Sequence, residues 1–180
     1  MAADRIIFIR HAEKPADGIS GIDEKGRPDA DSLIPRGWQR AGALVHLFDP
    51  SRPVDPAASM LPDVIYAAGL GEGSHSRRSL ETATPLAQWL APRRVPFVTS
   101  FVKEDHAGVA ADIATRSGIV LVVWEHKQIP AIAARVAPGA GTPADWPERF
   151  DLMWICDRQG GAWRFRATSQ ALLAGDEAAS

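Results

Sequence analysis

The sequence predicts an α/β protein in which a mainly parallel sheet is covered by helices on both faces, giving three layers. Two short, nearly unbroken apolar runs, residues 6–9 and 119–124, are typical of strands buried on both faces. Strand and helix patterns alternate along most of the chain, which favours parallel strands joined by helices. The 180 residues are 46% hydrophobic, enough for one core. We expect one domain over residues 1–168 and a partly disordered tail over 169–180.

Helices are indicated where apolar residues recur at spacings of three and four. The first is expected to begin near Pro35, because proline suits the first turn of a helix. Its apolar face comprises Trp38, Ala41, Val45 and Phe48. A second helix is expected where Leu80, Ala83, Ala87 and Leu90 share one face, and Pro85 should kink it or limit its first part. Shorter helices are expected near 108–116 and 129–136.

The remaining strands are shorter or lie later in the chain. We expect strands at 64–67 and near 97–101, between the predicted helices. Residues 152–156 and 162–166 flank a turn that contains Gly160 and Gly161, which predicts a hairpin at one edge of the sheet. The stretch 138–147 is rich in glycine, proline and alanine and is expected to form a long surface loop. Trp146 is expected to anchor this loop to the core, with contact to a substrate as the less favoured alternative.

Composition and charge exclude several classes of function. A net charge of −2 and a pI near 6.2 provide no broad basic surface, so we expect neither nucleic-acid nor membrane binding. Cys156 is the only cysteine, which excludes an intrachain disulfide, a CxxC redox pair and a four-thiolate zinc site. No apolar run approaches 18 residues, and the run at 6–9 is too short for a signal peptide. We therefore expect a cytoplasmic protein.

Histidines and basic residues follow both buried strands. Arg10 and His11 come directly after the first strand, and Glu125, His126 and Lys127 after the second. In an open parallel sheet, ligands bind beyond the carboxyl ends of the strands, so these side chains are expected to share one site.

Two arginines, Arg77 and Arg78, open the second predicted helix after a glycine-rich loop. Cations at the start of a helix oppose its dipole by about 0.3–1 kcal/mol each, whereas an anion bound there reverses the effect. The arginines therefore either bind an anion or extend into solvent.

Three segments together resemble the histidine phosphatase superfamily, also called phosphoglycerate mutase-like. IFIRHAE at 7–13 resembles the signature strand and Arg-His-Gly loop of that family, RSLETA at 78–83 its Arg-x-x-x-Thr-Ala helix start, and VVWEH at 122–126 its second catalytic strand. SLIPRG at 32–37 is similar to the segment that leads into the family's first helix. The resemblance covers roughly residues 5–135, in the family's order. It implies a phosphoglycerate mutase-like fold.

The resemblance also implies roles for individual residues. His11 would be the nucleophile that carries the phosphoryl group as a phosphohistidine, with Arg10, Arg78 and His126 surrounding the phosphate. Arg78 is preferred to Arg77 because it lies four residues before Thr82, as in the family motif. The sequence departs from the family at Ala12, where glycine is usual, and lacks the asparagine that often follows the nucleophile.

The identity of a general acid stays open at this stage. A carboxylic acid would protonate the leaving oxygen and then activate water. Glu104 or Asp105, after the third strand, lies where many members of the family carry their acid. Glu125 adjoins His126, but in a regular strand it would point to the opposite face. A further alternative is that no dedicated acid exists, as in relatives that act on good leaving groups.

The sequence thus favours a metal-independent phosphatase that acts on a phosphorylated small molecule or a phosphoprotein and uses no cofactor. No HxxxH or HxH pair occurs, and the two arginines would repel a catalytic metal ion. A phosphomutase is less favoured, because the Glu-Arg-His-Tyr type insertion of the family's mutases is not found. A different class of alternative is a phospho-ligand sensor that has the pocket but no turnover. The sequence does not indicate an oligomeric state.

Overall fold

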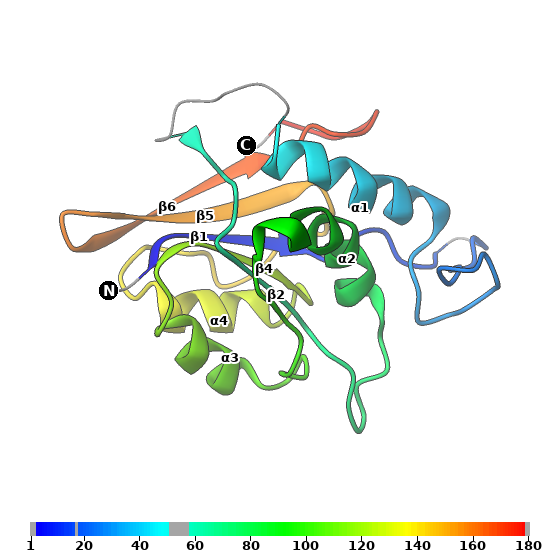
Figure 1. Cartoon of the computed structure of the whole chain (residues 1–180), viewed down its shortest axis with the longest axis horizontal. Helices are drawn as coiled ribbons and strands as arrows, with labels where there is room; N and C mark the ends of the chain where they lie inside the picture. The colour runs from blue at the N-terminus through cyan, green and yellow to red at the C-terminus, as the bar shows by residue number, and fades with distance from the viewer. Residues whose placement is uncertain (1–2, 17, 51–57, 179–180) are drawn as a thin grey trace.

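Six strands form one mixed sheet in the computed structural model, which describes residues 3–16, 18–50 and 58–178 (Figure 1). The strand order is β3-β2-β4-β1-β5-β6. The first four strands in this order are parallel, whereas β5 is antiparallel to β1 and β6 is antiparallel to β5. The strands are β1 (Ala3–Arg10), β2 (Val64–Ala67), β3 (Phe97–Val98), β4 (Gly118–Trp124), β5 (Leu152–Gln159) and β6 (Ala162–Ser169).

Two pairs of helices cover the two faces of this sheet, so the predicted three-layer α/β fold is confirmed (Figure 1). Residues of α1 and α2 pack on one face, and residues of α3 and α4 pack on the other. The helices are α1 (Pro35–Phe48), α2 (Arg78–Leu90), α3 (His106–Ile113) and α4 (Ile129–Val136), and a short 3₁₀ helix, η2 (Ala91–Arg93), follows α2.

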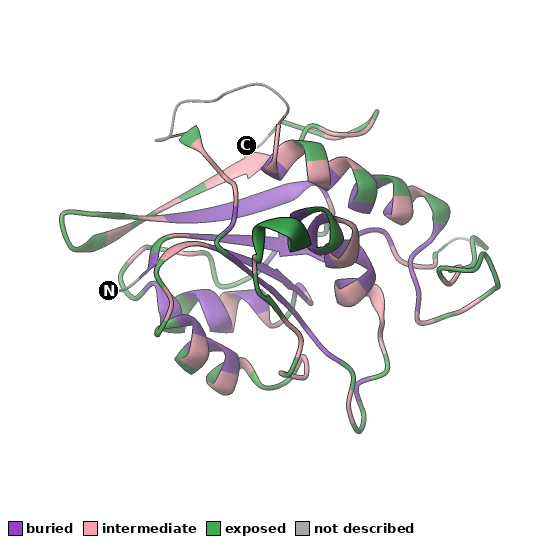
Figure 2. Ribbon diagram, in the orientation of Figure 1, coloured by how far each residue is buried: buried purple, intermediate pink, exposed green. Residues whose placement is uncertain are grey.

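The central strands β1 and β4 are buried on both faces, as their apolar runs predict (Figure 2). Side chains of a strand alternate between its faces, so Phe8 and Val122 pack beneath α3 and α4 while Ile9 and Val123 pack beneath α1 and α2. At about 25 cal/mol per Å² of apolar surface, two fully covered central strands provide a large part of the hydrophobic stabilisation.

Parallel pairing of β1 with β4 brings the ends of both strands together. Arg10 is opposite Trp124 in the register, and the His11 N–H donates to the Trp124 carbonyl at 3.0 Å. Strand β2, which lies on the other side of β4, ends at the same edge of the sheet, where the Ala68 N–H donates to the Val123 carbonyl. The segments that follow β1, β2 and β4 therefore leave the sheet side by side.

Most of the predicted helices and strands are present in the structure, but several begin or end at different residues. Helix α4 has the expected bounds, whereas α3 begins at His106 rather than Gly108 because the Asp105 side chain accepts from the Gly108 N–H and caps the helix. The strand expected over 97–101 is only two residues long, and both strands of the hairpin are three residues longer than predicted. β6 is an edge strand, as expected.

Helix α2 continues without a break through Pro85 to Leu90, so the proline does not end the helix. Proline removes one backbone hydrogen bond, but Leu86, Ala87 and Leu90 beyond it are buried in the core under α1 and α2. Tertiary packing of the apolar face thus outweighs the local cost of the proline.

Arg40, a buried side chain of α1, joins the segment after β1 to the end of the chain. Its guanidinium donates to Glu13 at 2.9 Å and to both carboxylate oxygens of Asp176 at 3.0 and 2.8 Å. Hydrogen bonds to the two carboxylates outweigh burial and raise the pKa of Arg40, while Arg40 lowers that of Asp176. Gln170 accepts from the same guanidinium. Residues up to Asp176 of the expected tail are therefore held against α1.

The start of α1 packs directly on the segment that contains His11. A Cβ at Gly37 would lie 2.6 Å from the Glu13 carbonyl oxygen, a distance that no side chain tolerates without a shift of backbone. The Ile34 N–H donates to that carbonyl at 3.1 Å. Glycine at 37 thus allows the close approach that positions residues 11–13.

We expect Gly37→Ala to destabilise the protein by roughly 1–3 kcal/mol, because the backbone of residue 13 must move. Gly42→Ala is the matched control in the same helix, where an added Cβ meets no atom within 4 Å. The control should stabilise by about 0.5–1 kcal/mol through helix propensity. Urea unfolding of the three proteins measures both effects, and equal stabilities of the two variants would contradict the close approach.

Candidate functional site

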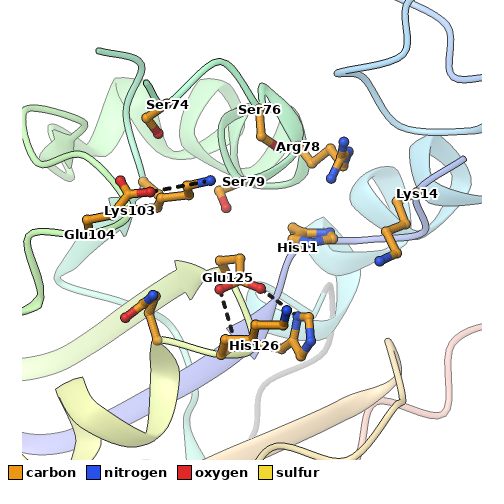
Figure 3. Close-up of a pocket in the computed structure, with 13 residues that line it drawn as sticks. His11, Lys14, Ser74, Ser76, Arg78, Ser79, Lys103, Glu104, Glu125 and His126 are labelled. Carbon is orange, nitrogen blue, oxygen red and sulfur yellow. Dashed lines mark hydrogen bonds and ion pairs between the residues drawn. The ribbon is translucent and has the colours of Figure 1, made fainter. Parts of the chain in front are cut away.

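A cavity of about 280 Å³ lies beyond the carboxyl ends of β1, β2 and β4 (Figure 3). Three of the residues that sequence reasoning singled out by resemblance, His11, Arg78 and His126, line it together. The other lining residues are Lys14, Ala68, Ser74, Ser76, Ser79, Lys103, Glu104, Glu125, Lys127 and Gln128. Among the described residues, four cationic side chains and two carboxylates line this cavity, so its charge is opposite in sign to that of the whole chain.

His11 is 3% exposed, and its ring is held in one orientation. Nδ1 lies 2.8 Å from the Ala12 carbonyl oxygen, which can only accept, so Nδ1 carries the proton in the neutral ring. This tautomer leaves the lone pair on Nε2. Burial, with smaller contributions from Arg10, Arg78 and His126, lowers the pKa of His11 to about 3. The imidazole is therefore neutral and nucleophilic over the physiological pH range.

Thr82 of α2 ties the His11 segment to the helix that carries Arg78. Its hydroxyl oxygen accepts from the Ala12 N–H at 2.8 Å and donates to the Arg78 carbonyl at 2.7 Å. Within the described chain, the only non-glycine residues with positive φ are Arg94 and Ala171, so Ala12 occupies an ordinary backbone conformation in which alanine replaces glycine without strain. The Arg-x-x-x-Thr spacing thus has a direct structural role.

Arg10, which is expected beside the phosphate, is fully buried and is not among the residues that line the cavity. Its guanidinium lies 4.1 Å from the centre of the Phe150 ring, and Nη1 donates to Glu148 at 3.3 Å. Nε and Nη2 are buried without a partner among the described residues. Burial lowers the pKa of Arg10, and Glu148 opposes this.

Arg78 lies at the first position of α2, as predicted, and lines the cavity. Nη2 donates to the Ala30 carbonyl at 3.3 Å, while the buried Nε has no partner in the described part of the chain. Arg77 instead lies 3.5 and 3.6 Å from the carboxylates of Glu24 and Glu81 and does not line the cavity. The preference for Arg78 over Arg77 therefore agrees with the geometry.

His126 is 8% exposed and lies between two carboxylates. Nδ1 is 2.9 Å from Glu125 Oε1, an ion-pair distance without the angles of a hydrogen bond, and Nε2 is 3.3 Å from Glu148 Oε1. Burial, together with Arg10, lowers the pKa of His126 despite the opposing effect of the two glutamates. Glu148 thus contacts both Arg10 and His126, although its own side chain is 78% exposed.

The structure separates the three acid candidates. Glu104 lines the cavity and pairs with Lys103 at 3.4 Å. Asp105 does not line it, because its carboxylate caps α3. Glu125 lines the cavity as well: β4 ends at Trp124, so the alternation expected of a regular strand does not extend to residue 125.

Sequence reasoning missed Glu148, Lys14, Lys103 and the three serines of the cavity wall. Lys14 and Lys103 follow the carboxyl ends of β1 and β3, the edge where ligands bind, and this position was an available signal. Glu148 belongs to the loop between α4 and β5, and nothing in its local sequence indicates a contact with Arg10. That loop is anchored as predicted, since Trp146 is 5% exposed and its ring lies 4.7 Å from that of Trp154.

The remaining histidines and possible metal ligands lie elsewhere. His46 is exposed on α1, and neither His75 nor His106 lines the cavity. No three or more His, Cys, Asp or Glu side chains are grouped to hold a metal ion in the described ranges. None of the helices described is both long and apolar enough to cross a membrane.

Comparison by structure shows the same fold in several known proteins, although no family model and no curated protein sequence matches the chain. The protein histidine phosphatase SixA, solved with tungstate, aligns with a TM-score of 0.55 and 14% identity over 92% of this chain and 97% of that chain. A putative α-ribazole-5′-P phosphatase from Escherichia coli K-12 aligns with a TM-score of 0.56 and 15% identity, covering 96% and 100%.

YhfR from Bacillus stearothermophilus is similar to the same extent, with a TM-score of 0.54 and 15% identity over 94% of this chain and 98% of that chain. At such identities the comparisons establish the fold alone. This chain therefore has the same fold as these solved phosphatases, which is the fold that the resemblance of its three sequence segments implies.

Proposed function

We propose that this protein is a metal-independent phosphatase that hydrolyses a phosphomonoester or a phosphoprotein through a phosphohistidine at His11. The proposal rests on one observation: a buried neutral imidazole lines a cavity together with Arg78, and buried N–H groups of Arg78 and of the neighbouring Arg10 have no partner among the described residues. Such unpaired buried donors cost about 1–3 kcal/mol each, more when charged, and a phosphoryl group supplies the oxygens that they lack.

Arg10 and Arg78 provide these donors. Nε and Nη2 of Arg10 and Nε of Arg78 are buried without partners in the described chain. Guanidinium groups form parallel hydrogen bonds to phosphate, and the start of α2 adds its free N–H groups and the positive end of its dipole. Because phosphoryl transfer depends mainly on positioning and charge stabilisation, this set of donors suits the transition state.

In the proposed first step, Nε2 of His11 attacks phosphorus in line with the leaving oxygen. The N–P bond forms as the P–O bond to the leaving group breaks. The proton stays on Nδ1, which continues to donate to the Ala12 carbonyl oxygen. The leaving oxygen takes a proton from an acid or from water. A water molecule then attacks phosphorus, the N–P bond breaks to release phosphate and the imidazole, and the proton that this water loses passes to the deprotonated acid or to solvent.

Glu104 and Glu125 are the carboxylates of the cavity wall that remain as acid candidates. Glu125 also contacts His126 Nδ1 and thereby orients that ring beside the phosphoryl position. For a substrate with a good leaving group, neither carboxylate is required.

The descriptions of two solved proteins with the same fold are consistent with this proposal. One is described as a protein histidine phosphatase bound to tungstate and another as a putative α-ribazole-5′-P phosphatase. Tungstate is an oxyanion, so the first of these binds a ligand of the class that we propose here.

We expect the protein to hydrolyse p-nitrophenyl phosphate in the presence of EDTA. Replacement His11→Ala should lower kcat/KM by roughly 1,000-fold or more, because the covalent route is lost. His46→Ala, an exposed histidine on α1, is the control and should retain the activity of the parent. Equal turnover by His11→Ala would exclude the covalent mechanism, and phosphate binding without turnover of any substrate would favour the sensor instead.

The low pKa of His11 should make the protein less stable in mild acid. Below about pH 6.5 the unfolded chain binds a proton at this residue, whereas the folded chain does so only near pH 3, so stability falls as the pH decreases through this window. Between pH 7 and pH 5 the parent should lose about 2 kcal/mol more than His11→Asn does. Urea unfolding at both pH values measures this difference, and an identical loss in the two proteins would contradict a neutral His11.

Glu148 should compete with the bound anion, because its carboxylate contacts Arg10 and His126. Glu148→Gln removes this charge and should tighten the binding of inorganic phosphate about two- to fivefold, the range expected of an exposed charge. Asp145→Asn, an exposed acid of the same loop, is the matched control and should change the affinity less. Isothermal titration calorimetry provides the measurement, and weaker binding by Glu148→Gln would show that Glu148 assists the site rather than competes.

A further inference from the structure

One wall of the cavity is polar and cationic but is not used by the proposed phosphoryl chemistry. It consists of Ser74, Ser76, Ser79 and Lys103, which we call the serine–lysine wall. In Figure 3 the Lys103 side chain extends toward Ser79, on the side of His11 away from Lys14. The wall comes from the segment between β2 and α2, the start of α2 and the segment after β3.

Backbone contacts hold the parts of this wall together. The Gly69 N–H donates to the Phe101 carbonyl at 2.8 Å, and Trp124 Nε1 of β4 donates to the Lys103 carbonyl at 2.9 Å. A Cβ at Gly69 would lie 2.0 Å from the Thr99 carbonyl oxygen, so glycine is required for this approach. Paired backbone hydrogen bonds between Gly71 and Ser74 turn the chain back, and Ser74 is 1% exposed.

The polar groups of the wall are available to a ligand. None of the three serine hydroxyls hydrogen-bonds to another residue in the part of the chain that the structure describes. Among the residues that the structure describes, Lys103 pairs only with Glu104, at 3.4 Å, and the Glu104 side chain is 55% exposed, so this ion pair is weak. An ammonium group with neighbouring hydroxyls is suited to bind a phosphate or a carboxylate.

We propose that the substrate is a small molecule that carries a second anionic group besides the phosphoryl group that is transferred, and that the serine–lysine wall binds this second group. The proposal rests on the proposed function. The phosphoryl group lies against His11, Arg78 and His126, and the remaining cavity, of about 280 Å³ in total, accommodates a short linker and the second anion at Lys103. The burial of Ser74 favours a small ligand over the backbone of a phosphoprotein.

Three matched esters test this proposal: propyl phosphate, 3-(phosphonooxy)propanoate and propane-1,3-diyl bisphosphate. The parent should hydrolyse at least one of the two esters that carry a second anionic group with a kcat/KM roughly tenfold above that for propyl phosphate, the effect of one desolvated charge pair. Lys103→Met should reduce this ratio to about one. Lys25→Met, an exposed lysine outside the cavity, should leave the ratio unchanged. Circular dichroism and urea unfolding check that each variant is folded.

Binding separates failure of this inference from failure of the proposed function. Propylphosphonate and propane-1,3-diylbisphosphonate are not hydrolysed, and their dissociation constants give the same ratio without turnover. Tighter binding of the bisphosphonate that is lost in Lys103→Met supports the wall even if no ester is hydrolysed. The inference is overturned if the parent shows no preference in either assay, or if Lys103→Met keeps the preference. Hydrolysis of a phosphoprotein, with no preference among the small esters, would indicate a macromolecular substrate instead.

Discussion

The parallel pairing of β1 with β4 is the constraint on which the rest of the site depends. The register places Arg10 opposite Trp124, so the segments that follow β1 and β4 leave the sheet at the same level. His11 therefore lies beside the segment that contains Glu125 and His126. Apolar side chains on both faces of both strands maintain this register, because a shift by one residue would exchange the two cores. Packing far from the cavity therefore determines how closely the two histidines approach. α1 then supports the segment after β1 through Gly37 and Arg40, and α2 supports it through Thr82.

Charge in the cavity follows from this arrangement. A histidine surrounded by Arg10, Arg78 and a second histidine and removed from water stays neutral, which a nucleophile requires. The same cations would stabilise the anion that arrives, while Glu148 partly balances them in the free protein. The chain as a whole carries a net charge of −2, so attraction for an anion is a local property of one edge of the sheet.

The sequence predicted the elements whose side chains are buried on a regular period, because burial imposes that period directly. The runs at 6–9 and 119–124 indicated the two central strands, and the three motifs indicated His11, Arg78 and His126, which the structure brings into one cavity. Features that depend on where an element ends could not be predicted. The Asp105 carboxylate is used to cap α3, which starts at His106, and Glu125 lines the cavity because β4 ends one residue earlier. Glu148 and Ser74 lie in loops whose shapes depend on contacts distant in the sequence. The loop of Glu148 is held by the contact of Trp146 with Trp154, and the loop of Ser74 by the hydrogen bond of Gly69 with the segment after β3.

A crystal structure of the protein with bound vanadate would show whether His11 is the nucleophile of this cavity. We expect vanadium within bonding distance of His11 Nε2, with the vanadate oxygens contacted by Arg10, Arg78 and His126, and Glu148 displaced from Arg10. Vanadate bound away from His11, or bonded to a different side chain, would contradict it.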